Sequence, residues 1–229
     1  ARTFAGYFDG NGVVIYNMYS VGYAQAGLFP RPTNDNTQKT SWIKNITLCA
    51  SRSIGFHSAG GIVGEYHAPD TARTASVENC KVLNCWISDN NNQNAACQRV
   101  SGIIVGNITH NIATIKNCFA SGNVTSASEI SGGIVGQTSA YCPSLSIQNC
   151  IVIGSSAYPI VNGSNQKINK HLDVPGTYSG VYTTEDVDAA YADNHLLIEK
   201  SKKAFKYLWC ETNTAQAVIC GHQKFPTPP

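Results

Sequence analysis

The stretch Ile115-Lys116-Asn117-Cys118 decides the fold, because the same order of residue types recurs along the chain. The other copies are Ile15-Tyr16-Asn17-Met18, Ile43-Lys44-Asn45-Ile46, Val77-Glu78-Asn79-Cys80 and Ile147-Gln148-Asn149-Cys150. The asparagines lie 28, 34, 38 and 32 residues apart (17 to 45, 45 to 79, 79 to 117, 117 to 149). Copies at such intervals, with loops of variable length between them, indicate a stacked repeat architecture.

A second phrase, rich in glycine, interleaves with the first. Its copies are Gly27-Leu28-Phe29-Pro30, Gly61-Ile62-Val63-Gly64, Ile103-Ile104-Val105-Gly106 and Gly133-Ile134-Val135-Gly136. We expect the glycines to mark a corner or a tight strand entry, where the absence of side chains lets the coil close. The two apolar residues between them are expected to face the core.

The alternation of apolar and polar residues slips by one position at each asparagine of the first phrase. The first position is always Ile or Val and the second is polar, so strict alternation would turn the fourth position outward. The fourth position is nevertheless apolar or Cys. Such a slip indicates a bend, and Asn tolerates the left-handed backbone that a bend often needs. We therefore expect the five asparagines to stack as corners, with their amides hydrogen-bonded in a ladder.

Together the two phrases predict an all-β protein that forms a single-stranded parallel β-helix, or solenoid, of about five coils. Residues 1–154 are expected to form this β-helix, and residues 155–182 a degenerate last coil and loop. Because the open end of a solenoid exposes unpaired strand edges, we expect a C-terminal α-helical or mixed cap and a linker in residues 183–229.

Composition narrows the class of protein. Of the 229 residues, 42% are hydrophobic and only 13% are charged, which indicates a folded protein with a polar, uncharged surface. A net charge of +2 gives no basic field that would favour nucleic acid as a partner. No stretch approaches the roughly 18–20 apolar residues that span a bilayer. The start inside a phrase and the Pro226-Thr227-Pro228-Pro229 end suggest a segment with flanking domains in a larger chain.

The nine cysteines are expected to be mainly structural. Three follow the repeated asparagine and should stack as buried apolar thiols, with cross-coil disulfides as the alternative: Cys80, Cys118 and Cys150. Two further pairs bracket short loops and are candidate disulfides: Cys85 with Cys97, and Cys210 with Cys220. No Cys or His spacing suggests a zinc site, so we expect no metal and no cofactor.

The opening Phe4-Ala5-Gly6-Tyr7-Phe8-Asp9-Gly10-Asn11-Gly12 resembles the repeat of GLUG-motif proteins. Their Gly-Leu-x-Gly phrase is similar to Gly61-Ile62-Val63-Gly64 and to Gly133-Ile134-Val135-Gly136, and the resemblance covers residues 4 to about 154. It departs at Pro30 and at Ile103, where glycines would stand. The resemblance implies a β-helix like that of the pectate-lyase-like superfamily. It also implies an extracellular, bacterial, non-catalytic module of surface or adhesin-like proteins.

The acids of the repeats build no row that would indicate catalysis. Glu65 matches an Asn and a Gln in the later copies, and Glu78 matches a Lys and a Gln. Asp9-Gly10-Asn11-Gly12 lacks the further acidic ligands of a calcium loop and is expected to be a tight turn. An enzyme on this scaffold would cleave polysaccharide with paired carboxylates, or with a calcium-assisted base and an Arg or Lys. Clustering of Glu65, His67 and Asp70 with an Arg in one groove would favour this alternative.

The predicted function is therefore that of a secreted or cell-surface bacterial module with a structural or adhesive role. Exposed aromatic rings at Tyr66, Trp86 and Tyr141 are the candidate binding residues, with an extracellular glycan or a host surface as partner. Burial of these rings between coils would contradict that assignment. A polysaccharide lyase or glycoside hydrolase is one alternative, and a passive spacer in a longer surface protein is the other.

Overall fold

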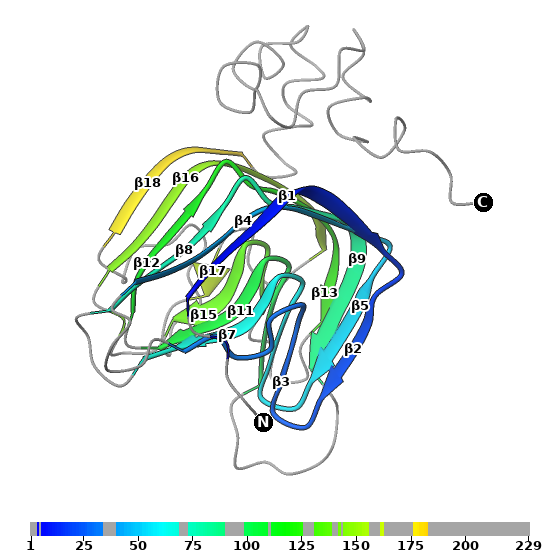
Figure 1. The fold of residues 1–229 in the computed structure, drawn as a ribbon. Helices are drawn as coiled ribbons and strands as arrows, with labels where there is room; N and C mark the ends of the chain where they lie inside the picture. The colour runs from blue at the N-terminus through cyan, green and yellow to red at the C-terminus, as the bar shows by residue number, and fades with distance from the viewer. Residues whose placement is uncertain are drawn as a thin grey trace, which may run out of the picture.

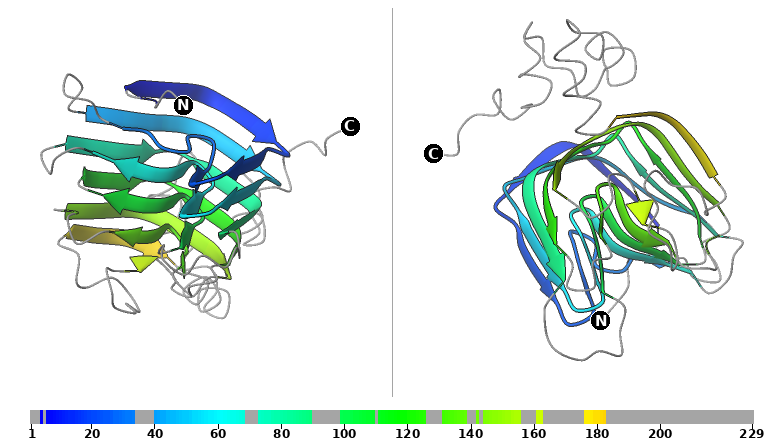
Figure 2. Two further views of the ribbon diagram at one scale, coloured as in Figure 1. Left: turned by 90° about the horizontal axis from the view of Figure 1, so that it is seen from below. Right: turned by 180° about the vertical axis from the view of Figure 1, so that it is seen from behind.

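The computed structural model describes residues 4, 6–33, 40–68, 73–89, 99–109, 111–125, 131–138, 142, 144–155, 161–162 and 176–182. This part of the chain is all-β and has no helix, so it has none that could cross a membrane. Its strands pair in parallel and wind into a solenoid, as Figures 1 and 2 show. The predicted cap in residues 183–229 lies outside the described residues.

Three turns of the solenoid are complete in the described residues, each with four strands. They comprise β4 (Thr40–Cys49), β5 (Arg52–Gly55), β6 (Ser58–Gly60) and β7 (Val63–His67); β8 (Arg73–Glu78), β9 (Lys81–Asp89), β10 (Val100–Gly102) and β11 (Val105–Thr109); and β12 (Asn111–Lys116), β13 (Phe119–Thr125), β14 (Ser131–Gly132) and β15 (Val135–Thr138). Shorter sets of strands flank them: β1 (Tyr7–Tyr16), β2 (Tyr19–Gly22) and β3 (Gln25–Ala26) before, and β16 (Ser144–Ser155), β17 (Val161–Asn162) and β18 (Gly176–Tyr182) after. The parallel β-helix is thus confirmed, whereas the number of about five coils stays a prediction.

The strands of successive turns build three sheets. The largest has the order β1-β4-β8-β12-β16-β13-β9-β5-β2, with β18 paired to β16. The second has the order β14-β10-β6-β3, and the third the order β17-β15-β11-β7. In Figure 1 the largest sheet forms an arch that descends on the right through β13, β9, β5 and β2. The chain then turns back into the second sheet and leaves through the third.

The predicted asparagine ladder is present, and its members have the predicted left-handed backbone. Asn45, Asn79, Asn117 and Asn149 have φ angles of 59°, 52°, 54° and 52°. Each side-chain Nδ2 donates to the Oδ1 of the preceding coil: Asn149 to Asn117 at 3.3 Å, Asn117 to Asn79 at 3.0 Å, and Asn79 to Asn45 at 3.2 Å. Asn45 donates in turn to Asp9 Oδ1 at 2.7 Å. The ladder therefore ends on a carboxylate.

The prediction that Asn17 is a fifth member of this ladder is wrong. In β1, Asp9 pairs with Lys44 and Val13 with Ile46, so three residues of β1 oppose a single residue of β4. This insertion at 10–12 moves the first copy of the phrase to the next corner. There Asn17 N donates to Cys49 O at 3.0 Å, and Ala50 N donates to Leu83 O at 2.9 Å. The left-handed residues of this second column are Asn17, Ala50 and Asn84, with φ angles of 55°, 47° and 52°.

The cysteines that follow the ladder lie in the core, as the slip in alternation predicted. Cys80, Cys118 and Cys150 are fully buried and are free thiols, so no disulfide joins their coils. The hydrogen bond that the Cys80 thiol donates to Cys118 raises the pKa of Cys80 well above its usual value, and burial raises the pKa of Cys118 likewise. Cys80 and Cys118 are therefore packing groups that do not ionise at neutral pH.

The candidate disulfide between Cys85 and Cys97 is not formed, because Cys85 is a buried free thiol. Its Sγ donates to Leu83 O at 3.3 Å and accepts from Ser51 N at 3.4 Å, so it holds the second corner by hydrogen bonds. Cys97 and the pair Cys210 and Cys220 lie outside the described residues.

The glycine phrase closes the coil by close backbone approach. A Cβ on Gly106 would lie 2.4 Å from Gly64 O, and a Cβ on Gly136 would lie 2.5 Å from Gly106 O. No side chain fits at either position. Closure also holds at Pro30, whose O accepts from Glu65 N at 3.0 Å, and at Ile103, whose O accepts from Gly61 N at 2.9 Å.

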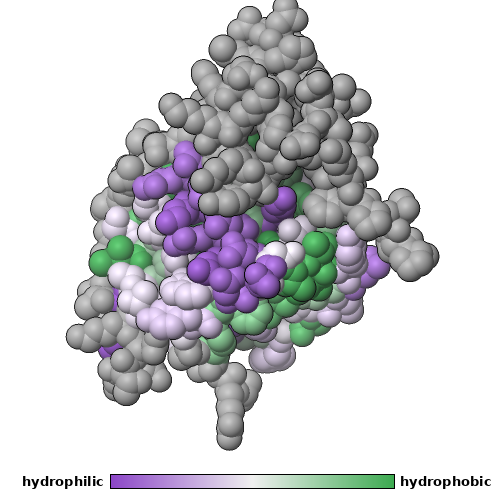
Figure 3. Space-filling view, turned by 45° about the horizontal axis from the view of Figure 1, so that its top comes forward, coloured by the Kyte–Doolittle hydropathy of each residue, from purple (hydrophilic) through white to green (hydrophobic). Residues whose placement is uncertain are grey.

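Charges of alternating sign form a row on the outer face of the largest sheet. Register places Asp9, Lys44, Glu78 and Lys116 in successive coils. Lys44 Nζ lies 3.4 Å from Asp9 Oδ2, and Lys116 Nζ lies 3.1 Å from Glu78 Oε2. Figure 3 shows hydrophilic residues gathered on the described part of the face that is turned toward the viewer. Opposite charges face each other on neighbouring strands only in the observed register, so this row favours that register.

Candidate functional site

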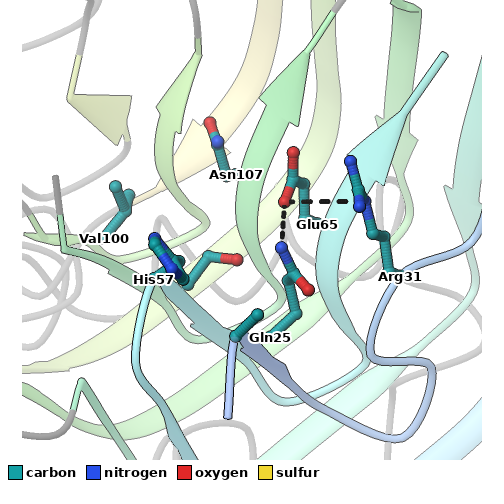
Figure 4. Close-up of a pocket in the computed structure, with 8 residues that line it drawn as sticks. Gln25, Arg31, His57, Glu65, Val100 and Asn107 are labelled. Atoms are coloured by element: carbon teal, nitrogen blue, oxygen red, sulfur yellow. Dashed lines mark hydrogen bonds and ion pairs between the residues drawn. The ribbon is translucent and has the colours of Figure 1, made fainter. Parts of the chain in front are cut away.

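A cavity of about 430 Å³ lies where the second and third sheets meet at an angle. It is lined by Ala24, Gln25, Arg31, His57, Ser58, Glu65, Val100 and Asn107. Figure 4 shows that Gln25, Arg31 and Glu65 converge, with His57, Val100 and Asn107 beside them. The tight turn at Gly60-Gly61 creates this angle, because it sends the chain from β6 into β7 without a long loop.

Repeat register arranges the walls of the cavity in rows. On the second sheet Gln25 pairs with Ser58, which pairs with Val100. On the third sheet Glu65 pairs with Asn107, which pairs with a Gln and then an Asn: Gln137 and Asn162. Rows formed by parallel pairing run along the solenoid axis. The cavity lies between these two rows and is called here the axial groove.

Glu65 is the charged centre of the axial groove and is only 8% exposed. Gln25 Nε2 donates to its Oε2 at 2.6 Å, and Thr109 Oγ1 donates to its Oε1 at 3.0 Å. Two basic side chains lie farther off: His67 Nδ1 at 3.6 Å from Oε1, and Arg31 Nε at 4.0 Å from Oε2. The carboxylate is thus held in one orientation by hydrogen bonds from two different coils.

Three buried polar atoms that line the cavity have no hydrogen-bond partner in the described structure. They are Arg31 Nε, Ser58 Oγ and Asn107 Oδ1. Ser58 is 1% exposed, so bulk water does not solvate its hydroxyl. Buried polar groups in folded proteins are nearly always paired, and three exceptions in one cavity suggest that something polar fills it.

The groove meets part of the condition that would favour an enzyme. Glu65 and His67 lie together with an arginine, Arg31, while Asp70 lies outside the described residues. No second carboxylate of the described chain lines the cavity, so glycoside hydrolysis by paired carboxylates is not assembled from these residues. The described residues also contain no cluster of His, Cys, Asp and Glu that could hold a metal ion. The arrangement can bind and orient a polar ligand, and it offers a single carboxylate together with the imidazoles of His57 and His67.

The structure places the three predicted binding residues in different environments. Tyr66 is only 2% exposed, and its hydroxyl donates to Ser76 O at 3.1 Å, so it is a core residue and the expected exposed ring is absent. Tyr66 lies opposite Ile108 in the neighbouring coil, and both side chains point into the core. Glu65, one residue earlier, points to the other side and faces the groove. Trp86 is 37% exposed, and the Arg52 guanidinium covers one face of its ring. Tyr141 lies outside the described residues.

Sequence reasoning did not find Gln25, Arg31 or Thr109. Aligning the glycine phrases already matches Glu65 with Asn107 and Gln137. The same alignment could have identified these residues as one row of the third sheet. Gln25 and Arg31 come from the first, shorter turn, where only the three-dimensional winding brings them to Glu65.

The fold and the groove define the class of this protein as a parallel β-solenoid with a polar axial groove. Comparison with protein-family models, with curated proteins and with solved structures finds no match to the chain.

Proposed function

We propose that this chain is a structural or adhesive β-solenoid module of a secreted or cell-surface bacterial protein, and that it binds an extracellular or host-surface glycan in the axial groove. The resemblance to GLUG-motif repeats supports the location and the membership of a larger chain with flanking domains. The observation that most favours binding is the set of unpaired buried polar atoms beside Glu65.

The chemistry of the groove suits a neutral sugar. A sugar hydroxyl both donates and accepts, so it can pair with the acceptor Asn107 Oδ1, with Ser58 Oγ and with the donor Arg31 Nε. The carboxylate of Glu65 is balanced by the nearby Arg31, which leaves little net charge to attract an ion. Because the rows run along the solenoid axis, a glycan can lie along them and meet Glu65 and Asn107 in successive coils.

A glycan array followed by calorimetry tests this function. Asn107→Ala removes a groove acceptor and is expected to weaken binding by about tenfold, the usual effect of one lost hydrogen bond to a bound ligand. Gln148→Ala is the matched control, since it removes an amide from the outer face and should change binding less than about twofold. Absence of any bound glycan, or equal loss in both variants, contradicts the proposal and leaves the spacer role.

The second candidate is a polysaccharide lyase or glycoside hydrolase, and the observation that favours it is the contact of Glu65 with His67 and Arg31. Incubation with a panel of polysaccharides, monitored for new reducing ends and for unsaturated products, tests it. Turnover by the wild type that is abolished in Glu65→Gln would establish catalysis. Binding without turnover would favour the adhesive module.

We further propose that the solenoid has about five coils and that residues 183–229 cap its end. Support comes from β1–β3 and β16–β17, which pair with the complete turns in the same parallel manner. A chain truncated after residue 182 should aggregate if the cap covers the last strand edge, and light scattering measures this. A truncated chain that stays monomeric would contradict the cap.

A further inference from the structure

The outer face of β2, β5 and β9 carries an unusual number of exposed apolar side chains. Of the eight exposed large hydrophobic residues in the described chain, four lie on or beside this face. They are Tyr19, Val21, Tyr23 and Trp86, with exposed fractions of 65%, 55%, 86% and 37%. The Tyr23 ring also packs against Phe56 in a tilted arrangement, with ring centroids 5.2 Å apart. Exposed apolar residues gathered on one face usually mark a binding surface.

One cation lies in the middle of this face. Register places Tyr19, Arg52 and Trp86 opposite one another in successive coils. The guanidinium carbon of Arg52 lies 3.5 Å from the centroid of the Trp86 ring and 5.9 Å from that of Tyr19. Stacking on Trp86 fixes the plane of the guanidinium and leaves the N–H groups at its edge directed away from the ring.

The Arg52 guanidinium makes no hydrogen bond or ion pair with the residues that the structure describes. Its row continues to Asn123, and the adjacent row contains Val21, Ile54 and Ser88, so no acid faces it from these positions. Asp89, at the end of β9, is buried and pairs with Gly55. The face thus presents an uncompensated positive charge in a fork that matches a planar or tetrahedral anion.

We propose that this face, the Arg52 platform, binds an acidic glycan that runs along the solenoid axis. A sugar ring stacks on Tyr19, and an anionic group of the same chain accepts hydrogen bonds from the Arg52 fork. Trp86 is a positioning residue that holds the guanidinium in place. This inference rests on the proposed function only in that the ligand is a glycan, because it uses a different face from the axial groove.

The geometry favours a glycan over other anionic partners. Successive coils lie about 4.8 Å apart, which is close to the length of one sugar unit in an extended chain, so consecutive sugars meet Tyr19 and Arg52 in turn. Recognition of an acidic lipid surface normally uses clusters of about 4–8 basic residues, whereas Arg52 is the only basic residue of its row and the adjacent row among the described residues. Flat rings beside a lone fork suit a ligand with a planar apolar face and one charged substituent.

Calorimetry with dextran sulfate and with unmodified dextran tests the platform, because the two polymers differ only in the anionic group. We expect the wild type to bind dextran sulfate more tightly than dextran. Arg52→Ala and Arg52→Lys should each lose about tenfold or more, since lysine keeps the charge but lacks the fork. Lys116→Ala removes one positive charge from another face and should lose less than about twofold.

The positioning role of Trp86 has its own readout in a double-mutant cycle. Trp86→Ala should weaken binding in the wild-type background and have almost no further effect in Arg52→Ala. Equal losses in Arg52→Ala and Lys116→Ala would show attraction by net charge alone and overturn the proposal. So would equal binding of the two polymers.

Other occupants of the platform are distinguishable outcomes. Self-association in sedimentation that is lost in Arg52→Ala would assign the face to a second copy of this chain. Arg52-dependent binding to phosphatidylserine vesicles with no binding to dextran sulfate would assign it to a membrane. Either result overturns the glycan proposal. The groove is tested with neutral glycans and Asn107→Ala, and the platform with dextran sulfate and Arg52→Ala, so failure of the groove and failure of the platform are separable.

Discussion

Replacing the central ladder residue Asn79 with alanine measures what the stacked amides contribute to stability. Asn79 donates to Asn45 at 3.2 Å and accepts from Asn117 at 3.0 Å, and both bonds are lost in Asn79→Ala. The ladder is half-buried, so the amides left behind on the two neighbours are only partly rehydrated. Alanine must also keep the left-handed φ of 52°, which is unfavourable for a residue with a Cβ.

The magnitude follows from these terms. Two hydrogen bonds contribute about 1 kcal/mol each, and the left-handed backbone adds about 1 kcal/mol, so the loss should be about 3 kcal/mol. Asn79→Gly loses the same hydrogen bonds without the backbone term and should cost about 2 kcal/mol. Asn17→Ala is the matched control, since Asn17 has a φ of 55° but no ladder bond, and it should cost about 1 kcal/mol.

Urea unfolding followed by far-UV circular dichroism measures all three variants under the same conditions. The expected order of destabilisation is Asn79→Ala, then Asn79→Gly, then Asn17→Ala. If Asn79→Ala costs no more than Asn17→Ala, the amide bonds contribute nothing and the asparagines are present only for their backbone conformation.

Three further outcomes are expected. Gly106→Ala should cost more than about 3 kcal/mol in urea unfolding, because its Cβ would lie 2.4 Å from Gly64 O, whereas Gly12→Ala has open space and should cost only the left-handed term of about 1 kcal/mol. Ala50→Asn should stabilise by up to about 1 kcal/mol in the same assay, since alanine there has a left-handed φ of 47°; a loss of stability would contradict this. Burial raises the pKa of Cys85 from 9.0 to about 11, so between pH 9 and 11 the unfolded state has released the thiol proton that the folded state retains. Cys85 should therefore lower stability by up to about 2–3 kcal/mol as pH rises through this window, and the total fall should be smaller by this amount in Cys85→Ala when the urea midpoints of both proteins are compared from pH 8 to 11.

The corners and the core could be predicted because a local rule controls them. A slip in alternation at an asparagine can be recognised from the neighbouring residues alone. The four ladder residues follow this rule: Asn45, Asn79, Asn117 and Asn149. Asn17 broke the rule because register depends on pairing with another coil. The extra residues at 10–12 shift every later position of β1 without any change in the phrase itself.

The site was less predictable for a related reason. Glu65 and Asn107 share a row that the repeat reveals, but Gln25 and Arg31 reach Glu65 only through the winding of the first turn. Tyr66 was expected at the surface because the sequence did not show whether its side chain points into the core or outward. A tyrosine can lie deep in a core when its hydroxyl finds a carbonyl, as it does at Ser76.

The asparagine ladder has a direction. Every amide donates toward the N-terminal coil, and the series ends at Asp9, whose carboxylate accepts but has no hydrogen to pass on. At the other end, Asn149 Oδ1 accepts nothing from the described residues. The aligned side-chain dipoles therefore give the solenoid a polarity, and its two ends are not equivalent. A designed array that lengthens this rod should add its coils after Asn149, where an acceptor is available, because Asp9 acts as a chain terminator.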